Sequence, residues 1–152
     1  MRTIVIGCDN AAVEMKNMVI AHLEAKGHRT ENMGVDSTED PANYPGLAKK
    51  VCAEVVRSGF QKRGVLFCGT GIGMAISANK CKGIRAAVCH DIFSARRSVL
   101  SNSCNVLCLG ARVIGPETAK AILDEWIQLE FVDGSSTPKV QDILAMEEEA
   151  FR

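Results

Sequence analysis

Short apolar runs alternate along the chain with segments in which apolar residues recur at helical spacing. The run at residues 3–8 is rich in β-branched residues, which favour a buried strand. Strands are predicted over residues 3–8, 29–33, 64–68, 84–88 and 105–109, the second being the weakest. The amphipathic segments predict helices over residues 12–26, 46–58, 71–79, 92–100, 116–126 and 139–151. Strands that alternate with helices indicate an α/β fold with a parallel sheet.

The connections between the strands decide how such a sheet is built. Crossovers between parallel strands are almost always right-handed, so this pattern is expected to place helices on both faces. We therefore predict a Rossmann-like, doubly wound fold with a five-stranded parallel sheet, helices on both faces and a C-terminal helix. A chain of 152 residues has room for one such core, and residues 1–152 are predicted to form a single domain.

Composition excludes several classes of protein. Eighteen Lys and Arg balance 18 Asp and Glu, so the chain lacks the excess positive charge of a nucleic-acid binder. Hydrophobic residues make up 47%, too many for a disordered chain, yet no apolar run approaches the roughly 18 residues of a membrane span. The first residues, MRTIVIGCDN, are unlike a secretory signal. We expect a cytoplasmic protein that binds neither nucleic acid nor membranes.

Seven cysteines are spread over the chain without a CxxC pair, at positions 8, 52, 68, 81, 89, 104 and 108. A disulfide scaffold is shorter and denser in cysteine, and a zinc site has paired ligands at close spacing. We predict no metal site and a reducing compartment, in which most of these thiols are small buried hydrophobic groups.

The residues that follow the strands carry most of the reactive side chains. Ligands of doubly wound sheets bind beyond the carboxyl ends of the strands. The segments at these positions are 8–10, 68–73, 89–91 and 110–112, and their reactive residues are Cys8, Asp9, Asn10, Cys68, Thr70, His90 and Arg112. This coincidence predicts an active site at that edge of the sheet, and therefore an enzyme.

The segment CGTGIG at residues 68–73 is the most informative of these. Its three alternating glycines let backbone N–H groups approach a ligand and face developing negative charge. A helix N-terminus also favours the thiolate of Cys68, which makes this residue a candidate base or nucleophile. The GxGxG spacing, on the third strand, differs from the dinucleotide fingerprint, so a nicotinamide dehydrogenase is not expected.

Two strings, CGTGIGMAISANK at residues 68–80 and GIRAA at residues 83–87, resemble the ribose-5-phosphate isomerase B / galactose-6-phosphate isomerase family. The resemblance runs from about residue 3 to 150 and includes GCD at 7–9, YP at 44–45, NVL at 105–107 and GARVIG at 110–115. It implies a cytosolic aldose–ketose isomerase of phosphorylated sugars that uses neither a metal nor another cofactor. It also implies a homodimer or homotetramer with the site at the subunit interface.

The resemblance also implies roles for individual residues. Cys68 is the base that takes the proton next to the carbonyl, and Thr70 assists transfer between the two oxygens. Such an enediolate mechanism needs a base and hydrogen-bond donors but no redox cofactor. The backbone donors implied for the enediolate oxygen are those of Gly69, Gly71, Ile72 and Gly73. The sugar contacts implied are those of Asp9, Asn10, Tyr44 and Asn102.

The chain departs from the pattern of the ribose 5-phosphate enzymes at several positions. Asn10 stands where they usually have histidine, and Ser101 stands where they carry the histidine that opens the sugar ring. Ser135 and Lys139 occupy the positions of two phosphate-binding arginines, which leaves Arg112 as the clearest phosphate ligand. Lysine holds phosphate as a point charge, without the bidentate fork of arginine.

Serine is a poor acid at neutral pH, so Ser101 leaves two explanations for ring opening. One is a four-carbon sugar phosphate, which forms no such ring; LSN at 100–102 and GARVIG resemble the branch of the family linked to erythrulose 4-phosphate. The other is that His90 supplies the acid, since we expect its strand to neighbour the strand of Cys68 in a doubly wound sheet. Alternatively, His90 and Asp91 together cap the following helix.

Three functional hypotheses follow. The first is a cofactor-independent sugar-phosphate isomerase with Cys68 as its base, and the second is a sugar-phosphate binding or regulatory protein on the same fold. The pair of Cys68 and Thr70 favours the enzyme, because a binding protein needs no thiolate. The third, a subunit that supplies half of a hetero-oligomeric site, is disfavoured because Cys68 and Asn102 stand in one chain.

Overall fold

The computed structural model describes residues 1–151, in which five strands and six α-helices alternate. The strands are β1 (Thr3–Cys8), β2 (Arg29–Asn32), β3 (Arg63–Cys68), β4 (Ala86–Val88) and β5 (Val106–Gly110). The helices are α1 (Val13–Ala25), α2 (Tyr44–Arg57), α3 (Ile72–Ala78), α4 (Ile92–Leu100), α5 (Pro116–Trp126) and α6 (Thr137–Ala150), with a short 3-10 helix, η1 (Asn10–Ala12), before α1. None of these helices is long and apolar enough to cross a membrane.

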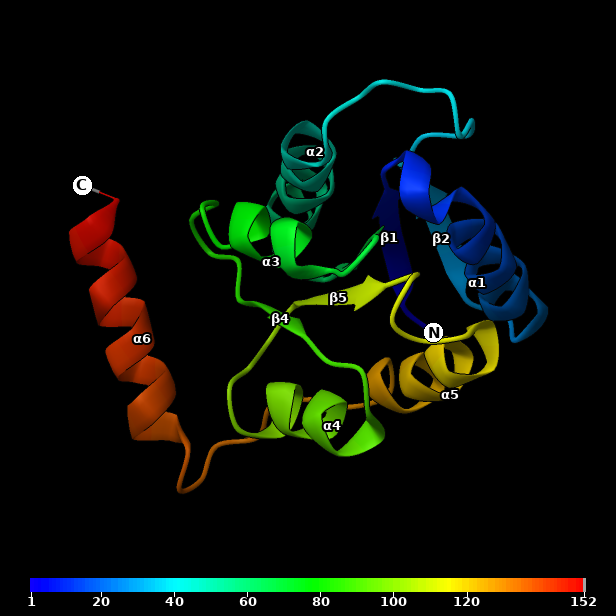
Figure 1. Ribbon diagram of the computed structural model, residues 1–152. Coiled ribbons are helices and arrows are strands. Elements are labelled where there is room, and N and C mark those ends of the chain that lie inside the picture. Colours follow the sequence, from blue (N-terminus) through cyan, green and yellow to red (C-terminus); the bar gives the residue numbers. More distant parts are fainter. Residues whose placement is uncertain (152) are drawn as a thin grey trace.

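All five strands run parallel, in the order β2-β1-β3-β5-β4 (Figure 1). Helices α2 and α3 pack on one face of the sheet, and α1, α4 and α5 cover the other. The arrangement confirms the predicted doubly wound fold. The chain turns outward from β1 to β2 and then proceeds in the opposite direction from β3, so the switch point, where such folds bind ligands, lies between β1 and β3.

The three central strands form the core of the molecule. Every residue of β3 and β5 is buried, and so are all residues of β1 except Thr3. Their runs of Val, Ile, Leu and Phe suit strands that are covered on both faces. The edge strand β4 is half-buried throughout, since no strand pairs with its outer side.

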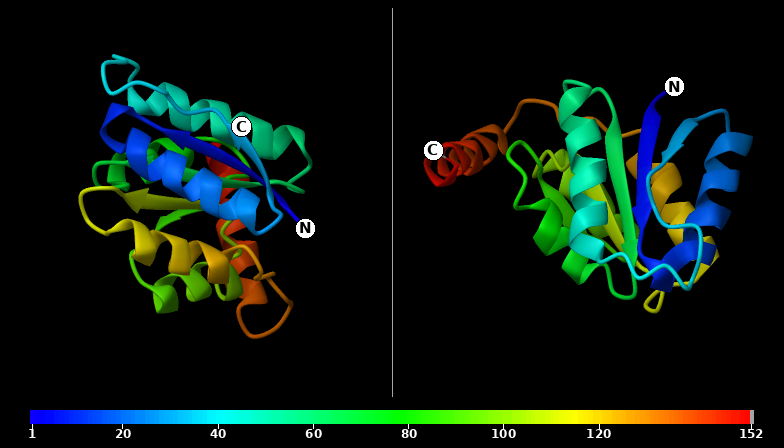
Figure 2. Two further views of the ribbon diagram at one scale, coloured as in Figure 1. Left: turned by 90° about the vertical axis from the view of Figure 1, so that its right-hand side faces the viewer. Right: turned by 90° about the horizontal axis from the view of Figure 1, so that it is seen from above.

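Helix α6 stands apart from the sheet (Figure 2). Val140 is its one buried residue, whereas Ile143, Leu144 and Met146 are exposed. Between this helix and the β4–α4 side of the body lies a cleft of about 730 Å³. An apolar helix face that its own domain leaves open is typical of a surface that packs against another molecule.

Three element boundaries differ by two residues from those predicted. Helices α2 and α6 begin two residues earlier than expected, and Pro45 and Pro138 lie in their first turns. Proline is favoured there because its fixed φ suits the helix and the first N–H groups have no intrahelical partner. The strand expected from residue 84 begins at Ala86, because the N–H of Arg85 donates instead to the side chain of Asn105 at 2.9 Å.

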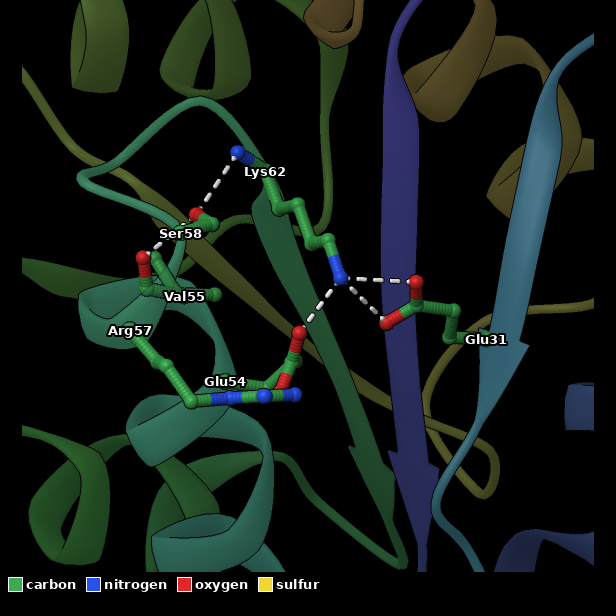
Figure 3. Close-up of polar contacts among 6 residues, drawn as sticks. All are labelled: Glu31, Glu54, Val55, Arg57, Ser58 and Lys62. Atoms are coloured by element: carbon green, nitrogen blue, oxygen red, sulfur yellow. Dashed lines mark hydrogen bonds and ion pairs between the residues drawn. The ribbon is translucent and has the colours of Figure 1, made fainter.

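An ion-pair network joins the edge strand β2 to α2 and to the start of β3 (Figure 3). Lys62 Nζ contacts the two carboxylate oxygens of Glu31 at 2.7 and 2.9 Å and also pairs with Glu54. Arg57 binds the same Glu54 carboxylate, whose side chain is 6% exposed. The hydrogen bonds from Lys62 and Arg57 hold the pKa of Glu54 below its usual value. The network therefore attaches β2 to the helix layer through charged groups.

Candidate active site

The carboxyl ends of β1, β3 and β5 bring one group of the predicted residues together. Cys68 pairs with Gly110 in the register of β3 and β5. The N–H of Asp9 donates to the carbonyl of Phe67 at 3.3 Å, and that of Ala111 donates to the carbonyl of Cys68 at 2.9 Å. The segments that follow these three strands therefore lie side by side at one edge of the sheet.

Cys68 ends β3 with 5% of its surface exposed. Its Sγ accepts a hydrogen bond from the N–H of Gly71 at 3.1 Å. Gly71 has φ +79°, and a Cβ at this position would lie 3.0 Å from the backbone carbon of Leu109. Both the dihedral angle and the close approach require glycine. The loop thereby aims an N–H at the sulfur, in a contact that is stronger for a thiolate than for a thiol.

The loop between β3 and α3 rests directly on the end of β5. A Cβ on Gly110 would lie 2.7 Å from the backbone of Thr70, so a larger residue at position 110 would lift the loop. Thr70 is exposed, and its Oγ1 accepts the N–H of Ile72 at 3.3 Å. The next N–H groups of α3, starting with that of Gly73, have no intrahelical carbonyl to bind, which suits them to an anionic oxygen.

Tyr44 and Arg112 pack against the two ends of this loop. A Cβ on Gly73 would lie 2.6 Å from Cζ of Tyr44, and a Cβ on Gly69 would lie 3.1 Å from Nη1 of Arg112. The backbone N–H of Arg112 also donates to the carbonyl of Gly69 at 3.0 Å. Both side chains are exposed, so a ligand held over the loop would meet a phenol at one end and a guanidinium at the other.

Asp9 and Asn10 follow β1 at the same edge. Asp9 Oδ1 accepts the N–H of Ala11 at 3.0 Å and so caps η1. This contact uses one carboxylate oxygen of the half-buried Asp9 and leaves the other for a ligand. Asn10 is exposed.

His90 lies one strand farther from Cys68 than we expected, because β5 separates β4 from β3. Its Nε2 accepts the N–H of Gly110 at 2.8 Å, and Gly110 is the sheet partner of Cys68. Burial lowers the pKa of His90 below its ordinary value, since it disfavours the charged imidazolium. The histidine therefore contacts the site through the backbone of β5.

The cap of α4 involves Asp91 rather than His90. Asp91 Oδ1 accepts the N–H of Ser94 at 2.7 Å. Hydrogen bonds from Ser94 hold the pKa of Asp91 below its usual value. The expectation that His90 helps to cap this helix is therefore wrong, since its Nε2 binds Gly110 instead.

Ser101 and Asn102 lie at the opposite edge of the sheet. Helix α4 starts after β4, at the carboxyl edge, and runs back, so the residues after its end lie near the amino end of β5. Ser101 Oγ accepts a hydrogen bond from the guanidinium of Arg97. Asn102 is exposed and lines the cleft of about 730 Å³ beside α6. Within one chain, Ser101 and Asn102 are therefore separated from Cys68 by the length of the sheet.

Ser135 and Lys139 are also removed from the Cys68 loop. Helix α5 runs back from the end of β5, and the chain then leaves the sheet for α6 (Figure 2). Both residues are exposed around the start of α6. The structure thus divides the predicted site residues into one group at the carboxyl edge and a second group carried by the α4–β5 connection and α6.

Arg97 and Gly110 were not selected as site residues from the sequence. Arg97 precedes Ser101 by four residues on the same helix face, and this spacing is the signal by which it could have been found. Gly110 has no such signal, because its contact with the Thr70 backbone depends on β5 lying beside β3.

Six of the seven cysteines are buried and Cys81 is half-buried, which confirms that most of them are small core residues. Burial raises the pKa of Cys8 to about 11 and that of Cys104 to about 12, so both are thiols at neutral pH. Among residues 1–151, no group of three or more His, Cys, Asp or Glu side chains is placed to hold a metal ion.

Comparisons with known proteins extend over nearly the whole chain. A family model described as Ribose/Galactose Isomerase matches residues 4–143. The chain is 48% identical over 143 residues to a D-erythrulose-4-phosphate isomerase of Pectobacterium atrosepticum, which covers 94% of this chain and 93% of the relative. It is 40% identical over 148 residues to ribose-5-phosphate isomerase B of Escherichia coli, with 97% and 98% covered.

Solved structures agree with this relationship. The structure of ribose-5-phosphate isomerase B from Clostridium thermocellum superimposes with a TM-score of 0.92 at 36% identity, over 97% of this chain and 99% of that chain. Fold, length and sequence therefore agree with one another. The chain belongs to the ribose/galactose isomerase family and is a sugar-phosphate isomerase of the ribose-5-phosphate isomerase B type.

Proposed function

We propose that this isomerase interconverts the aldose and ketose forms of a four-carbon sugar phosphate such as D-erythrulose 4-phosphate. The observation that carries the proposal is Ser101, which stands where the ribose 5-phosphate enzymes it resembles have a ring-opening histidine. In a four-carbon aldose 4-phosphate the C4 oxygen is esterified and cannot close a five-membered ring on C1. Such a substrate needs no ring-opening acid. The name of the relative from P. atrosepticum supports the same substrate class.

The surroundings of Ser101 fit a binding role. Its hydroxyl oxygen accepts a hydrogen bond from Arg97, and a serine hydroxyl does not give up its proton near pH 7. The oxygen therefore suits a neutral contact to a sugar hydroxyl better than acid catalysis.

Cys68 is proposed as the base. In the aldose-to-ketose direction its thiolate takes the proton from C2, the C–H electron pair forms the C1–C2 double bond, and O1 takes the negative charge of a cis-enediolate. The thiol then returns a proton to C1, while the proton of O2 moves to O1 with the help of Thr70. The hydrogen moves as a proton throughout, so no electron acceptor is consumed.

Three features of the carboxyl edge support this mechanism. The N–H of Gly71 lies 3.1 Å from the sulfur and would stabilise its anionic form. The N–H groups of α3 that lack an intrahelical carbonyl, starting with that of Gly73, suit the enediolate oxygen. Arg112, beside Gly69, offers a guanidinium for the substrate phosphate.

The proposed site is shared between two copies of the chain. Ser101 and Asn102 lie at the edge of the sheet opposite Cys68, so a second subunit has to bring them to it. The exposed apolar side chains that line the cleft beside α6 favour such an interface; they include Phe93, Ile143, Leu144 and Met146. A symmetric pair of chains would cover this surface on both and complete two sites.

The proposal is tested by proton NMR in deuterated water with erythrose 4-phosphate, ribose 5-phosphate and allose 6-phosphate as parallel substrates. We expect turnover with solvent deuterium entering at the proton-transfer carbon, and a strong preference for the four-carbon sugar. Cys68→Ala should abolish both turnover and exchange. A preference for ribose 5-phosphate would overturn the four-carbon assignment, and full activity of the Cys68 variant would overturn the base. Binding of the sugars by the folded protein without turnover would favour a binding protein.

A further inference from the structure

The amino-terminal edge of the sheet carries arginines that the isomerase chemistry does not use. Arg2 precedes β1, Arg63 begins β3 and Arg85 precedes β4. Because parallel strands begin at one edge, the three side chains converge and line a cavity of about 280 Å³. Along β3, this edge is about 16 Å from Cys68 at the strand's rise per residue. The cavity is therefore separate from the carboxyl-edge site of the same chain.

The charge in this cavity is unbalanced. Glu130 is the one acidic residue among those that line it, all of which lie within residues 1–151. Its carboxylate pairs with both Arg2 and Arg63, although 61% of its side chain is exposed. Three guanidinium groups against one carboxylate leave an excess of positive charge that favours an anion.

Arg63 is a buried arginine that lines the cavity and is held firmly by its neighbours. Its side chain is 7% exposed, and its guanidinium lies 4.9 Å from the centre of the Trp126 ring. Nη1 donates to the carbonyl of Trp126 at 2.8 Å, and Nη2 donates to that of Leu129. Burial and the charge of Arg2 lower the pKa of Arg63 to about 10. The two neighbouring cations thus repel each other, and an anion between them would relieve this repulsion.

Arg2 has a donor without an acceptor. Its Nη1 is buried and makes no hydrogen bond within the part of the chain that the structure describes. A buried donor without a partner is costly and uncommon in proteins. Arg85 is oriented in the same cavity by a bond from its Nε to the carbonyl of Ser103 at 2.8 Å. The cavity is therefore lined by Arg2, which has one unpaired guanidinium nitrogen, and by Arg85, whose guanidinium is positioned by Ser103.

We propose that this cavity is a second anion site that binds a phosphate group, either inorganic phosphate or the end of a phosphate ester. Arg2 and Arg85 supply charge-assisted N–H bonds to its oxygens, as arginine commonly does for phosphate. Arg63 supplies a fixed charge behind them. The exposed Glu130 carboxylate competes with the anion for Arg2 and Arg63, so it is the group that an incoming phosphate displaces.

Two substitutions with opposite expected effects test the site. Binding of radiolabelled inorganic phosphate is measured by equilibrium dialysis at constant ionic strength. Arg2→Ala should weaken phosphate binding at the cavity on the order of tenfold, because a charge-assisted bond is lost. Glu130→Gln should strengthen phosphate binding at the cavity several-fold, because a competing carboxylate is removed. Arg29→Ala, which removes an exposed arginine of β2, should change phosphate binding neither at the cavity nor at the substrate site.

The substrate site also binds phosphate, but all three variants leave its residues intact. Isomerase activity and thermal melting confirm that each variant is folded. If the Arg2→Ala protein does not fold, Arg2→Gln is used in its place. If Arg2 and Arg29 variants bind phosphate equally well, or if Glu130→Gln brings no gain, the proposal is overturned. Competition by erythrose 4-phosphate in the Cys68→Ala protein distinguishes inorganic phosphate from a phosphate ester as the ligand of the cavity. If the sugar phosphate displaces labelled phosphate from the cavity, the ligand is a phosphate ester. If it does not, the ligand is inorganic phosphate.

Discussion

At the residue scale, the geometry of the site depends on positions where no side chain fits. Gly71 directs its N–H at Cys68 only because it adopts a left-handed conformation against the backbone of Leu109. The chemistry assigned to Cys68 therefore depends as much on this glycine as on the sulfur itself.

We expect Gly71→Ala to reduce both stability and activity. The left-handed conformation alone costs a non-glycine residue about 1–2 kcal/mol, and the contact with Leu109 would displace the loop. The free energy of unfolding in urea and kcat with the preferred sugar are the measurements. Gly46→Ala, in α2 with open space around its Cα, should be neutral or slightly stabilising. Equal behaviour of the two variants would contradict the role given to Gly71.

His90 offers a second test at this scale. Because its Nε2 accepts the N–H of Gly110, we expect His90→Ala to act through the position of β5 and to slow erythrose 4-phosphate and ribose 5-phosphate by the same factor. His90→Asn, which keeps an acceptor, should recover part of the loss for both sugars. The readout is kcat/KM for each sugar. A loss confined to ribose 5-phosphate would instead make His90 the ring-opening acid.

At the scale of secondary-structure elements, most helices and strands were predictable from local signals. Proline in the first turn of α2 and α6 displaced both predicted starts by two residues, since the same residue also marks loops. The length of the short strand β4 was overestimated because the backbone N–H of Arg85 donates to the side chain of Asn105 and not to a neighbouring strand. Boundaries of this kind depend on individual hydrogen bonds that residue type does not reveal.

The attachment of β2 to α2 leads to a prediction at the same scale. Lys62→Met removes the shared partner of Glu31 and Glu54 and leaves the poorly exposed Glu54 with Arg57 alone. We expect the melting temperature to fall by a few degrees. The measurement is thermal unfolding by circular dichroism.

The matched control is Lys82→Met, which breaks the exposed pair of Lys82 and Glu148. Exposed ion pairs contribute little to stability, so this variant should have the same melting temperature as the wild type. If both variants melt alike, the network of Lys62 adds nothing beyond a surface ion pair.

At the scale of the whole molecule, the separation of Cys68 from Asn102 predicts complementation between subunits. Cys68→Ala and Asn102→Ala proteins should each be poorly active. After they are mixed and their subunits exchanged, half of the dimers are hybrids with one intact site, so activity should recover to about a quarter of the wild-type value. The assay is turnover of the preferred sugar before and after exchange. No recovery, with exchange verified by mass spectrometry, would contradict a shared site.

The alternating elements, the parallel sheet and the position of CGTGIG at the end of a buried strand were all predictable from the residues, because periodicity and turn chemistry are encoded within a few positions of the chain. The tertiary structure alone decided that β5 lies between β3 and β4, which separates His90 from the strand of Cys68. It also decided that Ser101 lies at the edge opposite Cys68, and that Arg2, Arg63 and Arg85 share one cavity. These spatial relationships involve residues that are far apart in the chain. They depend on how all the elements pack together, which no local sequence pattern predicts.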